Sequence, residues 1–189
     1  MPRLQIALDG NVDDDSQPVM VPRNQKPIVT TPPERAARLR AHLATVLSTS
    51  GQMTNAELAS PPEPENFGSR VARTACSLCR GWCCRNGDDD AFLDERTLAR
   101  VRQARPELNA DAILQLYDER VPAAGYSGSC IFHGKAGCTL DRTLRSDVCN
   151  SYFCGGLYSY LKSNDARTPV VVIAGEGNEM RTSPVLIPL

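Results

Sequence analysis

The chain has 189 residues, of which 41% are hydrophobic and 23% charged, a composition that suits one or two ordinary globular domains. Its 21 Lys and Arg residues nearly balance 22 Asp and Glu residues, which argues against a dedicated nucleic-acid-binding protein. No apolar stretch approaches the roughly 18 residues of a transmembrane helix, and the N-terminal sequence is not typical of a secretory signal. We therefore expect a cytoplasmic protein that binds neither nucleic acid nor membrane.

The N-terminal part is predicted to contain an extended arm and then a helix. Residues 1–32 are expected to be a weakly ordered arm, because repeated prolines remove backbone donors and disfavour helix. Within the next segment, residues 33–60, a helix is predicted over Glu34–Ser48, since Pro33 suits a first helical turn. The apolar stripe of this helix consists of Leu39, Leu43, Val46 and Leu47. His42 flanks that stripe and is expected to be a surface or packing residue.

Residues 61–75 are predicted to be a Pro-rich linker, followed by a cysteine-rich domain over residues 76–164. Inside that domain Asp94 can cap a helix over Glu95–Ala104, and Asn109 can cap the next one. The basic residues of the first helix are expected to form a solvated face, with neutralisation of thiolate charge as the second interpretation. These residues are Arg96, Arg100, Arg102 and Arg105.

The second half of the cysteine-rich domain is predicted to mix a hairpin with helices. Gly134 and Gly137 suggest a tight turn between Cys130 and Cys138, and helices are expected over Leu144–Cys154 and Leu157–Lys162. The tail, residues 165–189, is predicted to form a β-hairpin from the strands Val170–Ile173 and Pro184–Ile187. The fold class expected is α+β: a small, irregular, mainly helical, metal-stabilised domain with short β-hairpins.

Cysteine usage departs most from an ordinary composition. Eight cysteines fall in two clusters, and a reducing cytoplasm keeps thiols free, so such clusters point to metal or redox chemistry. We predict all eight as metal ligands, with ordinary buried thiols and disulfides as the less favoured alternatives. The first cluster is Cys76, Cys79, Cys83 and Cys84, and the second is Cys130, Cys138, Cys149 and Cys154.

The first cluster has the spacing CxxCxxxCC. If the segment is helical, Cys76, Cys79 and Cys83 lie on one helix face, where three thiols can converge on one metal centre. Gly81 weakens a helix by about 1 kcal/mol relative to alanine, so a loop-to-helix transition is an equal alternative.

With this spacing the sequence resembles the zinc- or iron-chelating domain family, the CxxCxxxCC family. The family pattern continues with a Cys, then Gly-Cys-x-hydrophobic, then Arg-Pro-x-x-Cys and a further Cys. Here Cys130, Gly137-Cys138-Thr139-Leu140, Arg145-Ser146-Asp147-Val148-Cys149 and Cys154 match in order. Ser146 stands where the family usually has proline, and the gap from Cys138 to Arg145 is slightly long. The resemblance covers Cys76–Cys154 and implies metal binding without fixing the metal.

The sequence leaves two cofactors open. Zinc favours four thiolates in a tetrahedron, and eight cysteines divide into two such sites, although only Cys76 and Cys79 form a standard knuckle. Iron–sulfur clusters tolerate varied spacing with one dense run of cysteines. The same family domain occurs in a flagellin lysine methylase, where it resembles an iron–sulfur module. We favour an iron–sulfur cluster slightly over Zn²⁺.

Two further residues near the cysteines are candidates for the site. Arg145, which matches the family pattern, is predicted to bind the cofactor by stabilising thiolate or cluster charge. His133 can be a ligand of a mixed Cys/His site, but with eight thiols available we expect a neighbouring, hydrogen-bonding role.

Three classes of function follow from these observations. The favoured one is a metal-binding protein that holds an iron–sulfur cluster or zinc through its eight cysteines. The second is a cluster-dependent redox or protein-modifying enzyme, which ranks lower because the sequence has no recognisable cosubstrate motif and no assignable catalytic residue. The third is a zinc-stapled module for interaction with a protein partner that the sequence does not identify.

Overall fold

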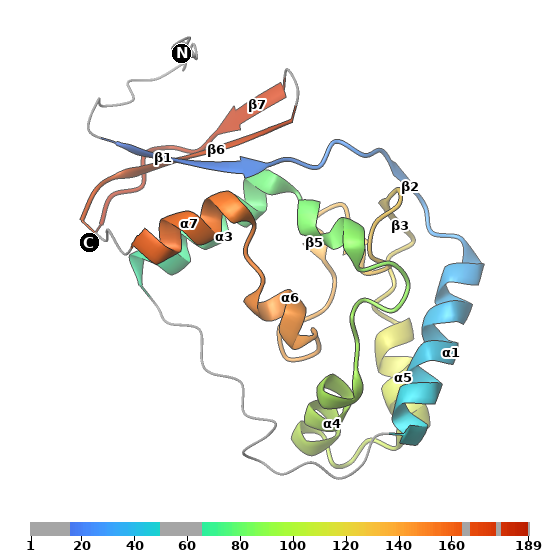
Figure 1. The fold of residues 1–189 in the computed structure, drawn as a ribbon. Helices are drawn as coiled ribbons and strands as arrows, with labels where there is room; N and C mark the ends of the chain where they lie inside the picture. Colours follow the sequence, from blue (N-terminus) through green and yellow to red (C-terminus); the bar gives the residue numbers. More distant parts are fainter. Residues whose placement is uncertain (1–15, 50–65, 164–166, 177–178, 189) are drawn as a thin grey trace. The chain divides into compact units, whose positions relative to one another are not determined.

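The computed structural model describes residues 16–49, 66–163, 167–176 and 179–188 (Figure 1). They form a small α+β fold, as predicted, and divide into two compact units. Among the described residues, the first unit contains 16–24, 66–80, 153–163, 167–176 and 179–188, and the second contains 25–49 and 81–152. The units therefore cut across the five segments expected from the sequence.

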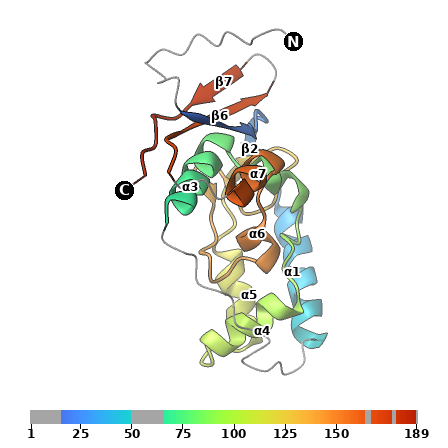
Figure 2. The same ribbon diagram turned by 60° about the vertical axis from the view of Figure 1, so that its left-hand side comes forward.

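The first unit is a three-stranded sheet with two helices. Strand β6 (Val170–Glu176) lies centrally, parallel to β1 (Gln17–Pro22) and antiparallel to β7 (Glu179–Thr182). Helices α3 (Phe67–Cys79) and α7 (Gly155–Ser163) contact the sheet and each other (Figures 1 and 2). The uninterrupted run Val170–Ala174 is buried, which is typical of a central strand whose two faces are both covered.

Two expectations for this unit need correction. The second strand of the C-terminal hairpin is Glu179–Thr182, whereas the predicted segment Pro184–Ile187 makes only an isolated bridge between Leu186 and Val170. Pro184 and Pro188 lack backbone donors, so this segment cannot continue a ladder. Helix α3 begins at Phe67, inside the predicted linker, because the Asn66 side chain accepts the Ser69 amide and caps it. Residues 61–65 of that linker lie outside the described residues.

The second unit contains three longer helices that the sequence predicted well. Helix α1 (Pro33–Thr49) buries Leu39, Leu43 and Leu47, and it contacts α4 (Glu95–Ala104) and α5 (Ala110–Asp118). Asp94 and Asn109 cap the latter two helices through their side chains, as expected. His42 does pack, since its Nε2 lies 2.6 Å from the Leu93 carbonyl oxygen.

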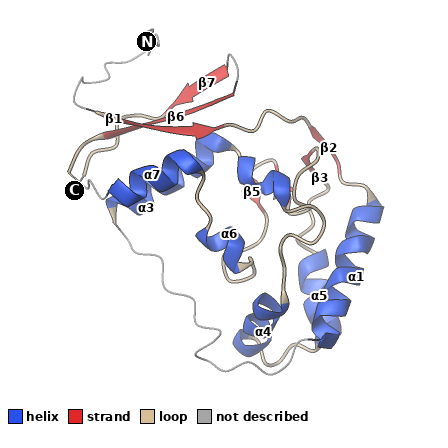
Figure 3. Cartoon of the chain, viewed as in Figure 1, coloured by secondary structure: helices blue, strands red, loops and turns tan. Residues whose placement is uncertain are grey.

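The remaining elements of the second unit are short, and loops connect them (Figure 3). Strands β2 (Ile28–Thr30), β3 (Ala124–Tyr126), β4 (His133–Gly134) and β5 (Gly137–Cys138) form an antiparallel sheet in that order. The hairpin expected between Cys130 and Cys138 is thus confirmed. Helix α6 covers only Asp147–Ser151, so the longer helix expected over Leu144–Cys154 is wrong. A turn at 141–144 precedes the Ser146 cap, and extended backbone at Tyr152 ends the helix.

The N-terminal arm was expected to be weakly ordered, but two of its segments pair in sheets. These are residues 17–22 in β1 and 28–30 in β2. Residues 1–15 of the arm lie outside the described part. Among the described helices, none combines the length and the apolarity needed to cross a bilayer.

Candidate metal centre

The CxxCxxxCC motif crosses the end of a helix. Cys76 and Cys79 lie on α3, which ends at Cys79, and Cys83 and Cys84 lie on the 3₁₀ helix η1 (Trp82–Asn86). Between them Arg80 (φ 53°) and Gly81 (φ 66°) adopt left-handed conformations that terminate α3. Of the two alternatives for this segment, the continuous helix with Cys76, Cys79 and Cys83 on one face is wrong, and the regular helix is interrupted near Gly81.

The cysteines divide unequally between the units. None of the eight forms a disulfide. The first unit holds three of them, namely Cys76, Cys79 and Cys154. The second unit holds the other five, namely Cys83, Cys84, Cys130, Cys138 and Cys149. Because these five come from three separate stretches of sequence, their gathering in one unit depends on tertiary structure.

Backbone hydrogen bonds fix the first two stretches together. The amide of Cys130 donates to the Cys84 carbonyl oxygen at 2.8 Å, and the Gly87 amide donates to the same oxygen at 3.2 Å. A Cβ at Gly87 would lie 2.9 Å from Cβ of Cys130 and 3.3 Å from its Sγ. The close approach of η1 to Cys130 therefore requires glycine at position 87.

The β4–β5 hairpin places an imidazole beside a thiol. His133 is the direct antiparallel partner of Cys138, so the two side chains project from the same face of the hairpin. The His133 amide donates to the Cys130 carbonyl oxygen at 2.9 Å. Its ring is 1% exposed, lies 4.5 Å from the Tyr126 ring centroid to centroid, and has Nδ1 2.7 Å from Oγ of Ser129.

Gly81 leaves room for that ring. A Cβ at this position would collide with Nε2 of His133 and would lie 3.2 Å from Sγ of Cys84. The histidine nitrogen and the cysteine sulfur thus border the same small space above the Gly81 backbone.

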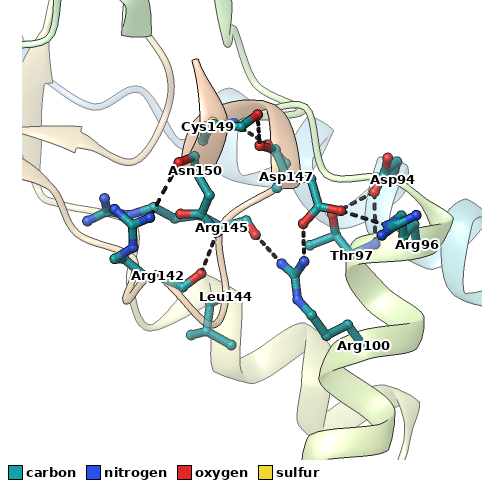
Figure 4. Close-up of polar contacts among 12 residues, drawn as sticks. Asp94, Arg96, Thr97, Arg100, Arg142, Leu144, Arg145, Asp147, Cys149 and Asn150 are labelled. Carbon is teal, nitrogen blue, oxygen red and sulfur yellow. Dashed lines mark hydrogen bonds and ion pairs between the residues drawn. The ribbon is translucent and has the colours of Figure 1, made fainter. Parts of the chain in front are cut away.

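Helix α6 brings the third stretch, with Cys149, to this neighbourhood. The Cys149 amide donates to Oγ of Ser146, and its Sγ lies 3.9 Å from the Ala91 carbonyl oxygen. At the start of α6, Asp147 accepts a hydrogen bond from Arg100 and forms an ion pair with Arg96, both of α4 (Figure 4). These two arginines therefore anchor α6, and the expectation of a purely solvated basic face is wrong for them.

Arg145, the predicted cofactor-binding residue, lies just before α6. Its Nε donates to the Leu140 carbonyl oxygen at 2.8 Å, and its own carbonyl oxygen accepts from Arg100 (Figure 4). Although Cys149 is an exposed residue, partial desolvation of its thiol raises its pKa, and the hydrogen bond from Ser146 and the more weakly acting charge of Arg145 oppose that rise. The role of Arg145 in binding a cofactor therefore stays a prediction.

The thiols interact electrostatically. A hydrogen bond from Cys84 lowers the pKa of Cys83 to about 7, and the same bond, with burial and the charges of Cys130 and Cys138, raises the pKa of Cys84. Burial, reinforced by the charges of Cys138 and Cys149, raises the pKa of Cys130 to about 12. Without a cation among them, most of these thiols stay protonated at neutral pH.

The donor chemistry of this neighbourhood suits a thiophilic metal, because it supplies several thiols, one imidazole and few competing oxygens. Among the described residues, however, no three His, Cys, Asp or Glu side chains are arranged to hold a metal ion as they stand. Coordination would therefore require side-chain rotation at these positions.

Sequence reasoning missed several residues that support the site. Arg35 of α1 donates to the buried carboxylate of Asp89 and, at 2.6 Å, to the Ser129 carbonyl oxygen. It thereby holds the loop after η1 and the segment before Cys130 against α1. Nothing local in the sequence pairs these positions, since 54 residues separate Arg35 from Asp89.

Compared with protein-family models, with curated proteins and with solved structures, the chain matches none. The resemblance of Cys76–Cys154 to the zinc- or iron-chelating domain family therefore stays a prediction.

Proposed function

We propose that this protein is a metal-binding protein that holds an iron–sulfur cluster or Zn²⁺ through cysteine thiolates, with the centre built on the second unit. The observation that carries the proposal is the gathering of five free cysteines from η1, the β4–β5 hairpin region and α6. Five thiols without disulfides, together with a buried imidazole, form a donor set that ordinary packing does not require.

The surroundings of these cysteines fit a structural centre. The strands β4 and β5 have two residues each, and α6 has five, so few backbone hydrogen bonds hold them. A bound ion or cluster would cross-link the three stretches and stabilise them against unfolding. Arg145 and Arg35, whose charges act on Cys149 and Cys130, would offset part of the thiolate charge.

The other three cysteines belong to the first unit and stay predicted ligands, namely Cys76, Cys79 and Cys154. Eight cysteines without a disulfide suit a reducing compartment, and we propose the cytoplasm.

The test is metal and acid-labile sulfide analysis with a visible spectrum, on untagged protein purified without oxygen. We expect stoichiometric metal in the wild type and its loss in Cys130→Ser and Cys138→Ser, with circular dichroism to confirm that each variant is folded. His42→Gln, which changes a histidine bonded to the Leu93 carbonyl oxygen, is the control and should keep the metal.

Each result has a clear meaning. Brown protein with equal iron and sulfide would establish a cluster, and colourless protein with zinc would establish a zinc site. Wild-type protein without stoichiometric metal, with all eight thiols reacting freely with a thiol reagent, would overturn the proposed function.

A further inference from the structure

The inference concerns His133, a buried histidine with a fixed ring. Its Nδ1 lies 2.7 Å from Oγ of Ser129, so its Nε2 points to the opposite side of the ring, toward Gly81 and Cys84. If the Ser129 hydroxyl accepts from Nδ1–H, the lone pair of Nε2 is directed into the space that it borders with Sγ of Cys84. Metal-binding histidines are held in this way, with the second ring nitrogen donating to a fixed acceptor.

Three of the five cysteines of the second unit belong to its hydrophobic core or pack against it. Cys130 belongs to the hydrophobic core of the second unit, and the half-buried Cys84 and Cys138 pack against the same core. Cys149, by contrast, is exposed, and Cys83, although half-buried, is not among the residues that pack against this core. The inner set is therefore Cys84, Cys130 and Cys138.

His133 is connected to each of these three residues. It stands directly across the hairpin from Cys138, its amide bonds to the Cys130 carbonyl, and its Nε2 and the Cys84 sulfur flank Gly81. One imidazole and three thiols on connected backbone segments supply the donor types of a Cys₃His zinc site.

We propose that His133 is a metal ligand through Nε2, completing with Cys84, Cys130 and Cys138 a four-ligand zinc site in which Ser129 fixes the histidine tautomer. This rests on the proposed metal-binding function and narrows it, because three sulfurs and one nitrogen suit Zn²⁺, whereas most iron–sulfur clusters take four thiolates. Zn²⁺ bound by three thiolates and one neutral imidazole carries a net charge of −1, and the charge of Arg35 acts on Cys130 to offset it.

The deciding measurement is X-ray absorption at the zinc edge on the full-length, zinc-bound protein as purified. The expected shell is three sulfurs at about 2.3 Å and one nitrogen at about 2.0–2.1 Å. His133→Gln should lose the nitrogen and bind zinc at least tenfold more weakly, as measured by competition with a zinc chelator. Ser129→Ala should keep the nitrogen but weaken binding by about 10-fold, the effect of losing an outer hydrogen bond.

The chain offers a matched control, because His42 is its other histidine. His42→Gln should retain both the nitrogen scatterer and the wild-type zinc affinity. Among the cysteines, Cys149→Ser should keep one zinc per chain at this site, whereas Cys84→Ser should lose it.

An all-sulfur shell in the wild type, around zinc or in an iron–sulfur cluster, would overturn the role of His133 and leave the proposed metal-binding function standing. A wild-type protein that holds no metal would overturn that function itself. If His133→Gln fails to fold, the wild-type spectrum alone decides between these outcomes.

Discussion

The two units of this protein achieve order in different ways. In the first, β1 pairs with β6 over six consecutive positions, and the valines of β6 are almost completely buried. In the second, the cysteine-bearing elements have two to five residues, and Asp88, Ala91 and Phe92 adopt positive φ between them. The first unit therefore depends on a continuous ladder and apolar burial, while the cysteine-bearing part of the second depends on specific side-chain anchors. The proposed metal would therefore stabilise the second unit more than the first.

Removal of the proposed metal should produce the largest difference in stability between the two units. With a chelator, we expect amide hydrogen exchange in η1, the β4–β5 hairpin and α6 to accelerate, because the cross-link among their thiols is lost. The free energy of unfolding of the second unit should fall by about 2.7 kcal/mol or more. This is the stabilisation given by a ligand present at a hundred times its dissociation constant. The amides of β1 and β6 should keep their protection. Equal acceleration in both units would contradict the division of roles.

A single substitution in α7 should destabilise the first unit and leave the second unit unchanged. Gly156 of α7 lies so close to β1 that a Cβ would collide with the Met20 carbonyl oxygen. We expect Gly156→Ala to lower the free energy of unfolding by about 1–3 kcal/mol, as overpacking does. Gly155→Ala is the matched control, because a Cβ there meets nothing within 4 Å. Metal content should be unchanged in both variants, as measured by elemental analysis.

A buried tyrosine should make the second unit sensitive to alkali. The Tyr117 hydroxyl donates to the Leu144 carbonyl oxygen at 2.9 Å, and burial, partly opposed by nearby arginines, raises the pKa of Tyr117 above its usual range. Its contribution is fully present below about pH 10, where unfolded tyrosine is neutral, and is lost as the pH rises toward the folded-state pKa.

Tyr117→Phe should therefore cost about 1 kcal/mol at pH 8, and this cost should shrink above pH 10. Denaturant unfolding at the two pH values measures both quantities. Tyr158→Phe, at a position 56% exposed, should show no difference at either pH. A cost for Tyr117→Phe that grows with pH would contradict the assignment.

The smallest effect is expected at the anchor of α6. Asp147→Asn weakens the ion pairs with Arg96 and Arg100. Because the site is partly exposed, the free energy of unfolding should fall by less than about 1 kcal/mol. Exchange of the α6 amides should accelerate, while zinc stays bound if Cys149 is outside the ligand set. Glu107→Gln, at an exposed position, serves as the control.

Local signals were sufficient for several elements and misleading for others. The caps Asp94 and Asn109 act within three residues, so both helices begin where the sequence predicted, and the first also ends there. The same local logic failed at Cys76–Cys83, because the left-handed pair Arg80 and Gly81 interrupts a spacing that looks helical. It failed again at the tail, where the partner of β6 is Glu179–Thr182 rather than the more apolar segment after it.

The sequence by itself determined the fold class, the longer helices with their caps and the hairpin before Cys138, and it marked the eight cysteines as the residues that carry reactive chemistry. Each of these is a local pattern or a matter of composition. Only the tertiary structure decided that five cysteines share one unit with His133, that Arg35 and Asp89 hold their loops, and that Arg96 and Arg100 anchor α6. These pairings join positions about 50 residues apart, such as Arg96 and Asp147, and no local periodicity encodes them. They arise when the apolar faces of distant elements pack together and bring the polar groups beside them into contact.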